Sequence, residues 1–278
     1  MRTISADLVY SAISDLIAKT VRVLPNDVLL ALDQAQKDES HPQAKEILAQ
    51  LLQNAAYAKA ENLPLCQDTG LAVFFVEHGE DVRLSGAGLH ETLTRAVVTA
   101  YGAYLRKSMC HPFSRVNTGN NTPISLHIEM KPGDMLKIGF LPKGGGADNM
   151  SRCAMLPPSA GKQGIIDFIL QTVAEAGSNP CPPIIAGIGI GGSFDQAPIA
   201  AKKMLLREIG TQSPDPEAAE LEQTLLAALN NLNIGPGGLG GHTTCLAVFV
   251  DIQPCHIASL PVAVNIQCNS VRRGVIEF

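Results

Sequence analysis

A cysteine, a glutamine and an aspartate stand in a row at Cys66, Gln67 and Asp68. They offer a soft thiolate ligand, a neutral amide, and a carboxylate able to accept or return a proton. Pro64 disfavours helix at the residue before it, and Gly70 can adopt backbone angles closed to other residues. We therefore expect a bent, rigid segment, of the kind on which functional sites are often found.

The cysteines are widely spaced and include no CxxC pair; they stand at 66, 110, 153, 181, 245, 255 and 268. This pattern argues against a closed zinc finger and favours a metal site assembled from distant segments. Cys66, Cys181 and Cys268 each lie where an expected element meets a loop, and prolines adjoin the first two. On spacing alone, a buried cysteine is more often a small apolar residue than a ligand.

Two other patterns suggest ligand contacts. The glycine-dense stretch 143–149 exposes backbone N–H groups that can cradle an anion, although a flexible connector explains it equally well, and it does not match a P-loop. The glycines at 187, 189, 191 and 192 superficially resemble a dinucleotide fingerprint, but two of them lie inside an apparent strand, so we do not expect a nucleotide there. Arg106 ends a helical pattern, where spacing alone favours interaction with the helix dipole over an anion clamp.

The elements that position these residues follow from hydrophobic periodicity. It predicts helices over 4–19, 27–37, 42–61, 87–107, 162–176, 195–208 and 216–232, and strands over 71–76, 124–130, 135–141, 184–190, 245–252 and 261–266. We expect 124–130 and 135–141 to pair as a hairpin across a Pro-Gly turn. The fold class is mixed α and β: an N-terminal helical region followed by a sheet with packed helices, in an unknown strand order. One domain over 1–278 is expected, with 211–216 as the best linker candidate.

Composition limits the function classes. The chain has 278 residues, a formal net charge of −5, 46% hydrophobic residues and no tryptophan. The acidic balance and the scarcity of aromatic residues argue against a nucleic-acid partner. No apolar run approaches the roughly 20 residues of a membrane span, and the N-terminus lacks a signal-peptide core. We therefore expect a cytoplasmic protein with no membrane association.

Five stretches together resemble one enzyme family, from about 62 to 273. They are Pro64-Leu65-Cys66-Gln67-Asp68-Thr69-Gly70, Val116-Asn117-Thr118-Gly119, Lys143-Gly144-Gly145-Gly146, Cys181-Pro182-Pro183 and Ala258-Ser259-Leu260-Pro261. In this order they are similar to the class I fumarase and L-tartrate dehydratase family of iron–sulfur hydro-lyases. The resemblance is to the alpha subunit of the two-subunit form, or the N-terminal part of the fused form.

The resemblance implies a [4Fe–4S] cluster held by Cys66, Cys181 and Cys268. One iron without a protein ligand would act as a Lewis acid on the substrate hydroxyl. Cys245 and Cys255 lie near the third ligand in sequence and are the alternatives to it.

The resemblance also implies a set of substrate contacts. Gln67 and Asp68 would reach a dicarboxylate substrate, with Asp68 as one member of the acid–base pair. Arg106 would grip a carboxylate, which replaces the dipole interpretation. Gly146 would offer its backbone N–H, and His256 would lie near the substrate.

The same resemblance implies partners and a reaction. The chain ends at Phe278, shortly after Cys268, whereas the fused enzymes carry a further domain; we therefore expect a beta subunit to complete the site, in a dimer of alpha–beta units. The implied reaction interconverts fumarate and (S)-malate, as in the tricarboxylic acid cycle. The alternatives are an L-(+)-tartrate dehydratase alpha subunit and a non-catalytic iron–sulfur or zinc scaffold or sensor. A histidine, His242, stands where the family often has lysine, which would make that loop's charge pH-dependent.

Overall fold

The computed structural model describes residues 1–278 and divides into two compact units. Unit 1 comprises Met1–Pro25, Ala55–Gly145 and Arg272–Phe278, and unit 2 comprises Asn26–Asn54 and Gly146–Val271. None of the helices combines the length and the apolar character needed to cross a bilayer. The segment 211–216, the linker candidate, lies inside unit 2.

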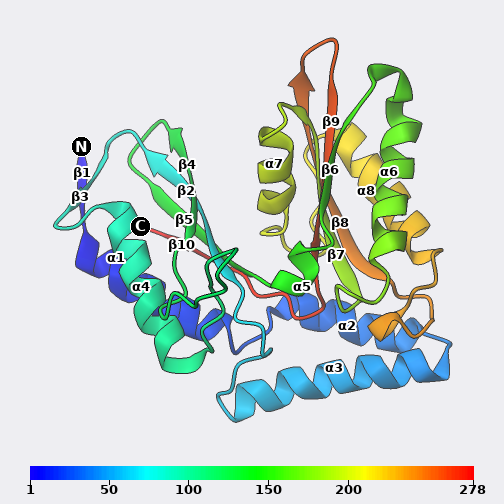
Figure 1. The fold of residues 1–278 in the computed structure, drawn as a ribbon, viewed down its shortest axis with the longest axis horizontal. Coiled ribbons are helices and arrows are strands. Elements are labelled where there is room, and N and C mark those ends of the chain that lie inside the picture. Colours follow the sequence, from blue (N-terminus) through cyan, green and yellow to red (C-terminus); the bar gives the residue numbers. More distant parts are fainter. The chain divides into compact units, whose positions relative to one another are not determined.

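Unit 1 is built on a four-stranded sheet with the order β10-β5-β2-β4, beside a two-stranded sheet of β1 and β3. Its elements are β1 (Arg2–Ser5), α1 (Ala6–Thr20), β2 (Leu71–Gly79), β3 (Val82–Ser85), α4 (Leu89–Tyr104), β4 (Ser125–Lys131), β5 (Leu136–Lys143) and β10 (Gly274–Glu277). The helices α1 and α4 pack together over the sheet (Figure 1) and share one hydrophobic core with β2 and β5. The loop that carries Cys66 to Gly70 leads directly into β2.

The predicted hairpin of 124–130 with 135–141 is wrong, although both segments are strands. β4 and β5 do not pair with each other; β2 lies between them, parallel to β4 and antiparallel to β5. The physical reason is the composition of β2, which is buried along most of its length and so gains most as an inner strand. β4 alternates with polar residues and lies at the edge of the sheet.

Unit 2 is a three-layer arrangement around a sheet with the order β6-β9-β7-β8. Figure 1 shows α7 on one face of this sheet and α6 and α8 on the other. The elements are α2 (Asn26–Asp38), α3 (Pro42–Ala60), α5 (Gly145–Asp148), β6 (Arg152–Leu156), η1 (Pro158–Ala160), α6 (Gly161–Ala176), β7 (Ile184–Gly192), α7 (Gln196–Met204), α8 (Pro216–Asn230), η2 (Pro236–Gly238), β8 (Cys245–Cys255) and β9 (Leu260–Gln267). α3 and α5 each contain residues of both units.

The glycines of β7 serve packing. A Cβ atom at Gly187 would collide with the carbonyl oxygen of Ala201, and one at Gly189 with that of Ala197. Only glycine lets α7 lie this close to the strand. The fingerprint-like glycine spacing is therefore explained by helix–sheet contact, without a nucleotide.

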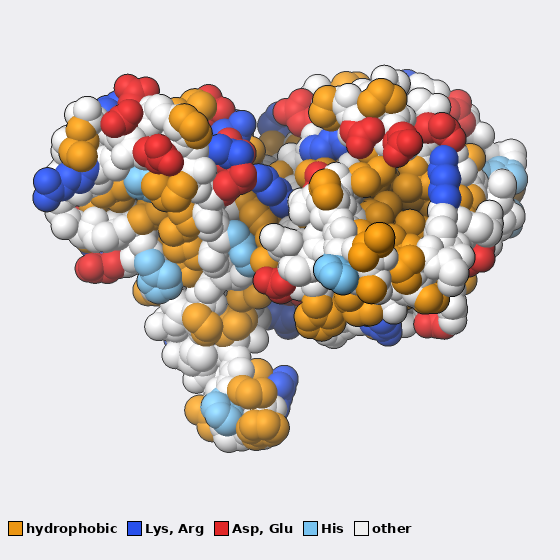
Figure 2. Space-filling view, turned by 90° about the horizontal axis from the view of Figure 1, so that it is seen from above, with side chains coloured by type: hydrophobic (Ala, Val, Ile, Leu, Met, Phe, Trp, Pro, Cys, Tyr) orange, Lys and Arg blue, Asp and Glu red, His pale blue; other side chains and the backbone are white.

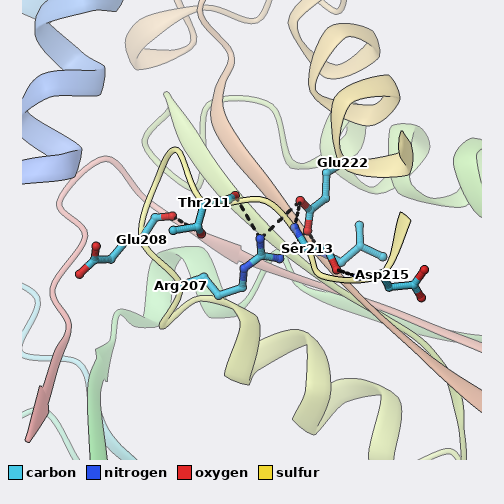
Figure 3. Close-up of polar contacts among 7 residues, drawn as sticks. Arg207, Glu208, Thr211, Ser213, Asp215 and Glu222 are labelled. Atoms are coloured by element: carbon cyan, nitrogen blue, oxygen red, sulfur yellow. Dashed lines mark hydrogen bonds and ion pairs between the residues drawn. The ribbon is translucent and has the colours of Figure 1, made fainter. Parts of the chain in front are cut away.

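A buried ion pair fixes the segment between α7 and α8 (Figure 3). The Arg207 guanidinium donates to the Glu222 carboxylate and lies 4.6 Å over the ring of Phe249. Glu222 also accepts from the backbone N–H groups of Val250, at 2.9 Å, and Ser213, at 3.3 Å. One carboxylate thus connects a helix, a strand and a loop.

Replacing Glu222 by Gln should destabilise the fold by about 3 kcal/mol, because it leaves a largely buried guanidinium without its counter-charge. Urea unfolding followed by circular dichroism measures the change. The matched control is Glu220→Gln on the same helix: Glu220 pairs with Lys162 in full contact with solvent, so no measurable change is expected. Equal loss in both variants would contradict this assignment.

Candidate functional site

The Asp68 carboxylate is held by two backbone N–H groups in unit 1. Oδ1 accepts from Gly70 at 3.0 Å, and Oδ2 accepts from Gly145 at 2.8 Å. Gly144 leaves room beside it, because a Cβ atom there would stand 3.1 Å from Oδ2, a tight contact. The bonds fix the direction of a carboxylate that remains partly accessible, as an acid–base group needs.

The backbone around Asp68 is anchored to the end of α4. The buried Thr69 hydroxyl donates to the carbonyl oxygen of Arg106 at 2.6 Å. The Asn121 side chain donates to the same carbonyl oxygen at 3.4 Å. Asp68 and Arg106 are therefore parts of one connected structure, although 37 residues separate Thr69 from Arg106.

Cys66 belongs to this same turn. Its sulfur, which is partly exposed, accepts the Asp68 backbone N–H at 3.4 Å. Cysteine binds metals as the thiolate, and this contact fixes the position of the sulfur in the turn. Unit 1 thus brings Cys66, Gln67, Asp68 and Arg106 into one loop region.

Cys181 and Cys268 come together in unit 2. Cys181 precedes β7 and Cys268 follows the antiparallel strand β9, with Ile185 opposite Gln267 in the register. Asn269 joins the two segments: its side-chain amide donates to the Cys181 carbonyl oxygen at 2.7 Å, and its backbone N–H donates at 3.3 Å.

The backbone at Cys181 is in the left-handed region, with φ of 53°. Non-glycine residues adopt this conformation infrequently and at a cost, which is found most often at functional positions. The exposed Cys181 therefore has its direction fixed by surrounding structure rather than by local preference.

The cysteines offer the type of donor that an iron–sulfur cluster requires. No disulfide joins any of the seven cysteines, so thiols are present as donors. The Gln267 side chain, adjacent to Cys268, is 1% exposed, and neither its nitrogen nor its oxygen has a hydrogen-bond partner. Buried amides normally have partners, so the residue next to Cys268 in the sequence has an unused donor and an unused acceptor. No group of three or more His, Cys, Asp or Glu side chains is arranged to hold a metal ion.

The alternative ligands are distinguished by their positions in unit 2. Cys245 lies in the hydrophobic core, where burial raises the pKa of its thiol to about 12 and keeps it protonated. Cys255 is exposed at the turn between β8 and β9, and its thiol donates to the Ser259 carbonyl oxygen at 3.1 Å. That turn is at the end of β9 opposite Cys268. Cys268 therefore remains the candidate third ligand.

The other two predicted contacts in unit 2, Gly146 and His256, differ in their distance along the fold from the cysteine segments. Gly146, in α5, lies beside Asn179 in the segment leading to Cys181: a Cβ at Gly146 would be 3.7 Å from the Asn179 carbonyl oxygen. His256, by contrast, lies in the β8–β9 turn with Cys255, so the structure of unit 2 does not bring it to Cys181 and Cys268.

Glu39 holds the second glycine-dense loop. Its side chain is 3% exposed and accepts from the backbone N–H groups of His41, His242 and Thr243, at 3.0, 2.9 and 3.2 Å. Burial alone would raise the pKa of this carboxyl group, but these hydrogen bonds and the charge of His242 outweigh burial and lower it.

This lowered pKa predicts a pH-dependent stability. A depressed folded-state pKa means that the ionised Glu39 stabilises the fold above the unfolded-state value near 4.3. The contribution, about 2 kcal/mol for hydrogen bonds to a charged group, is lost as pH falls through the folded-state value. Glu39→Gln should therefore lose stability at pH 7, and its difference from the native chain should be smaller at pH 3, in urea unfolding. An equal difference at both pH values would contradict the assignment.

Comparison with known proteins identifies the family. The family model described as "Fumarate hydratase (Fumerase)" matches residues 10–277. A relative from Methanocaldococcus jannaschii, named "Putative L(+)-tartrate dehydratase subunit alpha", is 42% identical over 95% of this chain and 96% of its own length. The "L(+)-tartrate dehydratase subunit alpha" of Escherichia coli strain UTI89 is 36% identical over 91% and 85%, and that of strain K12 is 35% identical over the same shares. The chain belongs to the fumarate hydratase family of hydro-lyases, with tartrate dehydratase alpha subunits among its relatives.

Sequence reasoning missed three residues that the structure adds to the site region: Asn269, Gln267 and the buried Arg272. Gln267 and Asn269 flank Cys268, and a search for amides around each candidate ligand would have found them. The adjacent arginines at 272 and 273, shortly after Cys268, are also a visible signal.

Proposed function

We propose that this chain is the alpha subunit of a hydro-lyase that interconverts fumarate and (S)-malate, with a [4Fe–4S] cluster held by Cys66, Cys181 and Cys268. The observation that carries the proposal is the Asp68 carboxylate, fixed by two N–H groups on the turn whose cysteine is a candidate ligand. A non-catalytic scaffold or sensor would have no use for an oriented carboxylate beside a ligand.

The chain's own residues divide the work. Asp68 exchanges a proton with the substrate through its carboxylate. Arg106 and the Gly146 N–H bind substrate carboxylates, and the Gln67 amide orients the substrate. When bound, the cluster supplies a Lewis acid at an iron without a protein ligand, which makes the hydroxyl a better leaving group.

A beta subunit completes the site and supplies the second acid–base group. The relatives are named as alpha subunits, which supports such a partner. Large apolar side chains are available for contact: Phe113 in unit 1 is 90% exposed and Ile257 in unit 2 is 91% exposed, and Figure 2 shows apolar side chains at the surface among polar ones. Exposed aromatic and aliphatic residues are typical of protein interfaces. We infer a dimer of alpha–beta units, in a reducing compartment such as the cytoplasm, which keeps thiols available.

L-(+)-tartrate is the second candidate substrate, to be dehydrated to oxaloacetate. The specific observation in its favour is that the relatives at 42% and 36% identity are named as tartrate dehydratase subunits. Both reactions remove water from a four-carbon hydroxydicarboxylate, so the same residues serve either.

The test is a rate comparison on the alpha–beta complex, purified anaerobically and reconstituted with iron and sulfide. We expect hydration of fumarate with a larger kcat/KM than dehydration of L-(+)-tartrate. The reverse order would transfer the assignment to tartrate. Turnover of neither substrate, with an intact cluster, would overturn the hydro-lyase proposal.

A further inference from the structure

The Arg272 guanidinium is buried behind the Asp68 turn. Arg272 is 1% exposed and lies in unit 1, shortly before β10. Nη1 donates to the Thr69 carbonyl oxygen at 3.4 Å, whereas Nε has no hydrogen-bond partner. Burying a guanidinium costs several kcal/mol unless a nearby opposite charge compensates. The counter-charge therefore has to be found in its surroundings.

Gly144 lies close to both the Asp68 carboxylate and the Arg272 guanidinium. A Cβ atom on Gly144 would lie 3.1 Å from Asp68 Oδ2 and 3.9 Å from Arg272 Nη2. The carboxylate and the guanidinium thus approach the same side of one glycine, which contributes no side chain of its own. Asp68 is therefore a counter-charge for Arg272, and Arg272 makes the turn's position electrostatically favourable.

Tyr101 cannot replace Asp68 as the counter-charge. Its side chain is fully buried in the core of unit 1, and its hydroxyl has no hydrogen-bond partner. Burial raises the pKa of that hydroxyl; the Arg272 charge opposes the rise and the Asp68 charge adds to it. The phenol stays neutral, so Tyr101 cannot neutralise the positive charge of Arg272.

We propose that Arg272 is a positioning residue for Asp68. It holds the Thr69 carbonyl from behind and attracts the carboxylate from across Gly144, so that Asp68 keeps one direction toward the substrate. The proposal rests on the proposed hydro-lyase function, because it concerns how precisely the acid–base group is placed. A misplacement of about 1 Å costs on the order of 100-fold in rate.

The experiment compares Arg272→Lys and Arg272→Met with the native chain in the reconstituted alpha–beta complex. Steady-state kcat and KM for fumarate, the thermal unfolding midpoint, and iron and sulfide content are measured for each. We expect kcat to fall about 10-fold in the lysine variant and about 100-fold in the methionine variant, with KM within about threefold of native.

The control is Tyr101→Phe, which removes the orphaned hydroxyl and keeps the ring. It should retain native kcat and KM, because the phenol carries no charge. If Arg272→Met does not fold, the kcat of Arg272→Lys tests the proposal, because lysine keeps the positive charge and lacks the planar guanidinium with its several N–H donors.

Native kcat in Arg272→Lys would overturn the proposal, as would a loss confined to KM, which would make Arg272 a substrate-binding residue. A fall in unfolding midpoint with unchanged kcat per folded complex would also overturn it. Failure of the hydro-lyase proposal itself is separate, because the native complex would then turn over neither fumarate nor tartrate.

Discussion

Asp68→Asn should lower kcat for fumarate hydration by about 10²- to 10⁴-fold while leaving the cluster in place. The amide has nearly the shape of the carboxylate and can still accept at one oxygen, so the turn that includes Cys66 is retained. It cannot take up a proton, because an amide is not a base at neutral pH. Steady-state kinetics of the reconstituted complex, with iron and sulfide analysis of the same sample, measures both effects.

The matched control for Asp68→Asn is Asp7→Asn, an exposed carboxylate in the first turn of α1. This variant should have native kcat. Retained turnover in Asp68→Asn would refute the acid–base role. Loss of iron together with turnover would show that Asp68 serves the metal site rather than proton transfer.

Cys181→Ser should lose the cluster and with it all measurable turnover. A serine hydroxyl is a harder donor than a thiolate and is not ionised at neutral pH, so it is a poor ligand for an iron–sulfur cluster. The anaerobic absorbance of the reconstituted chain and its sulfide content measure the loss. Circular dichroism should remain native, because Cys181 is exposed and its backbone is held by Asn269.

Cys153→Ser and Cys255→Ser are the controls for this prediction. Both cysteines are exposed in unit 2, as Cys181 is, and neither is a proposed ligand. These variants should keep the cluster and turnover. A native cluster in Cys181→Ser, or a lost one in Cys255→Ser, would require a different set of ligands.

Local patterns predicted the helices and most strands because their signals are close in sequence. The α8 helix begins as its residues indicate: Pro216 occupies the first turn, and the Asp215 carboxylate accepts the Glu217 N–H at 2.9 Å. The strands β1, β3, β6 and β10 were missed because each has only four or five residues and pairs with a distant segment: Arg2 with Val82, Arg152 with Val264, and Gly274 with Phe140.

The wrong hairpin and the missed supports of the site both depend on contacts between segments that are far apart in the sequence. The turn at Lys131 to Asp134 is compatible with a hairpin, but no local rule compares β4 with β2 as a partner for β5. The sequence motif predicted Cys66 and Asp68, whereas their supports lie far along the chain. The Asp68 bond to Gly145 spans 77 positions, and the Arg272 bond to Thr69 spans 203.

The most direct measurement is Mössbauer spectroscopy of the anaerobically purified, ⁵⁷Fe-enriched alpha–beta complex, with and without (S)-malate. The account predicts the signals of a [4Fe–4S] cluster, with one iron site whose parameters change when the substrate binds. Zinc in place of iron, or a cluster whose iron sites are all unaffected by malate, would contradict it.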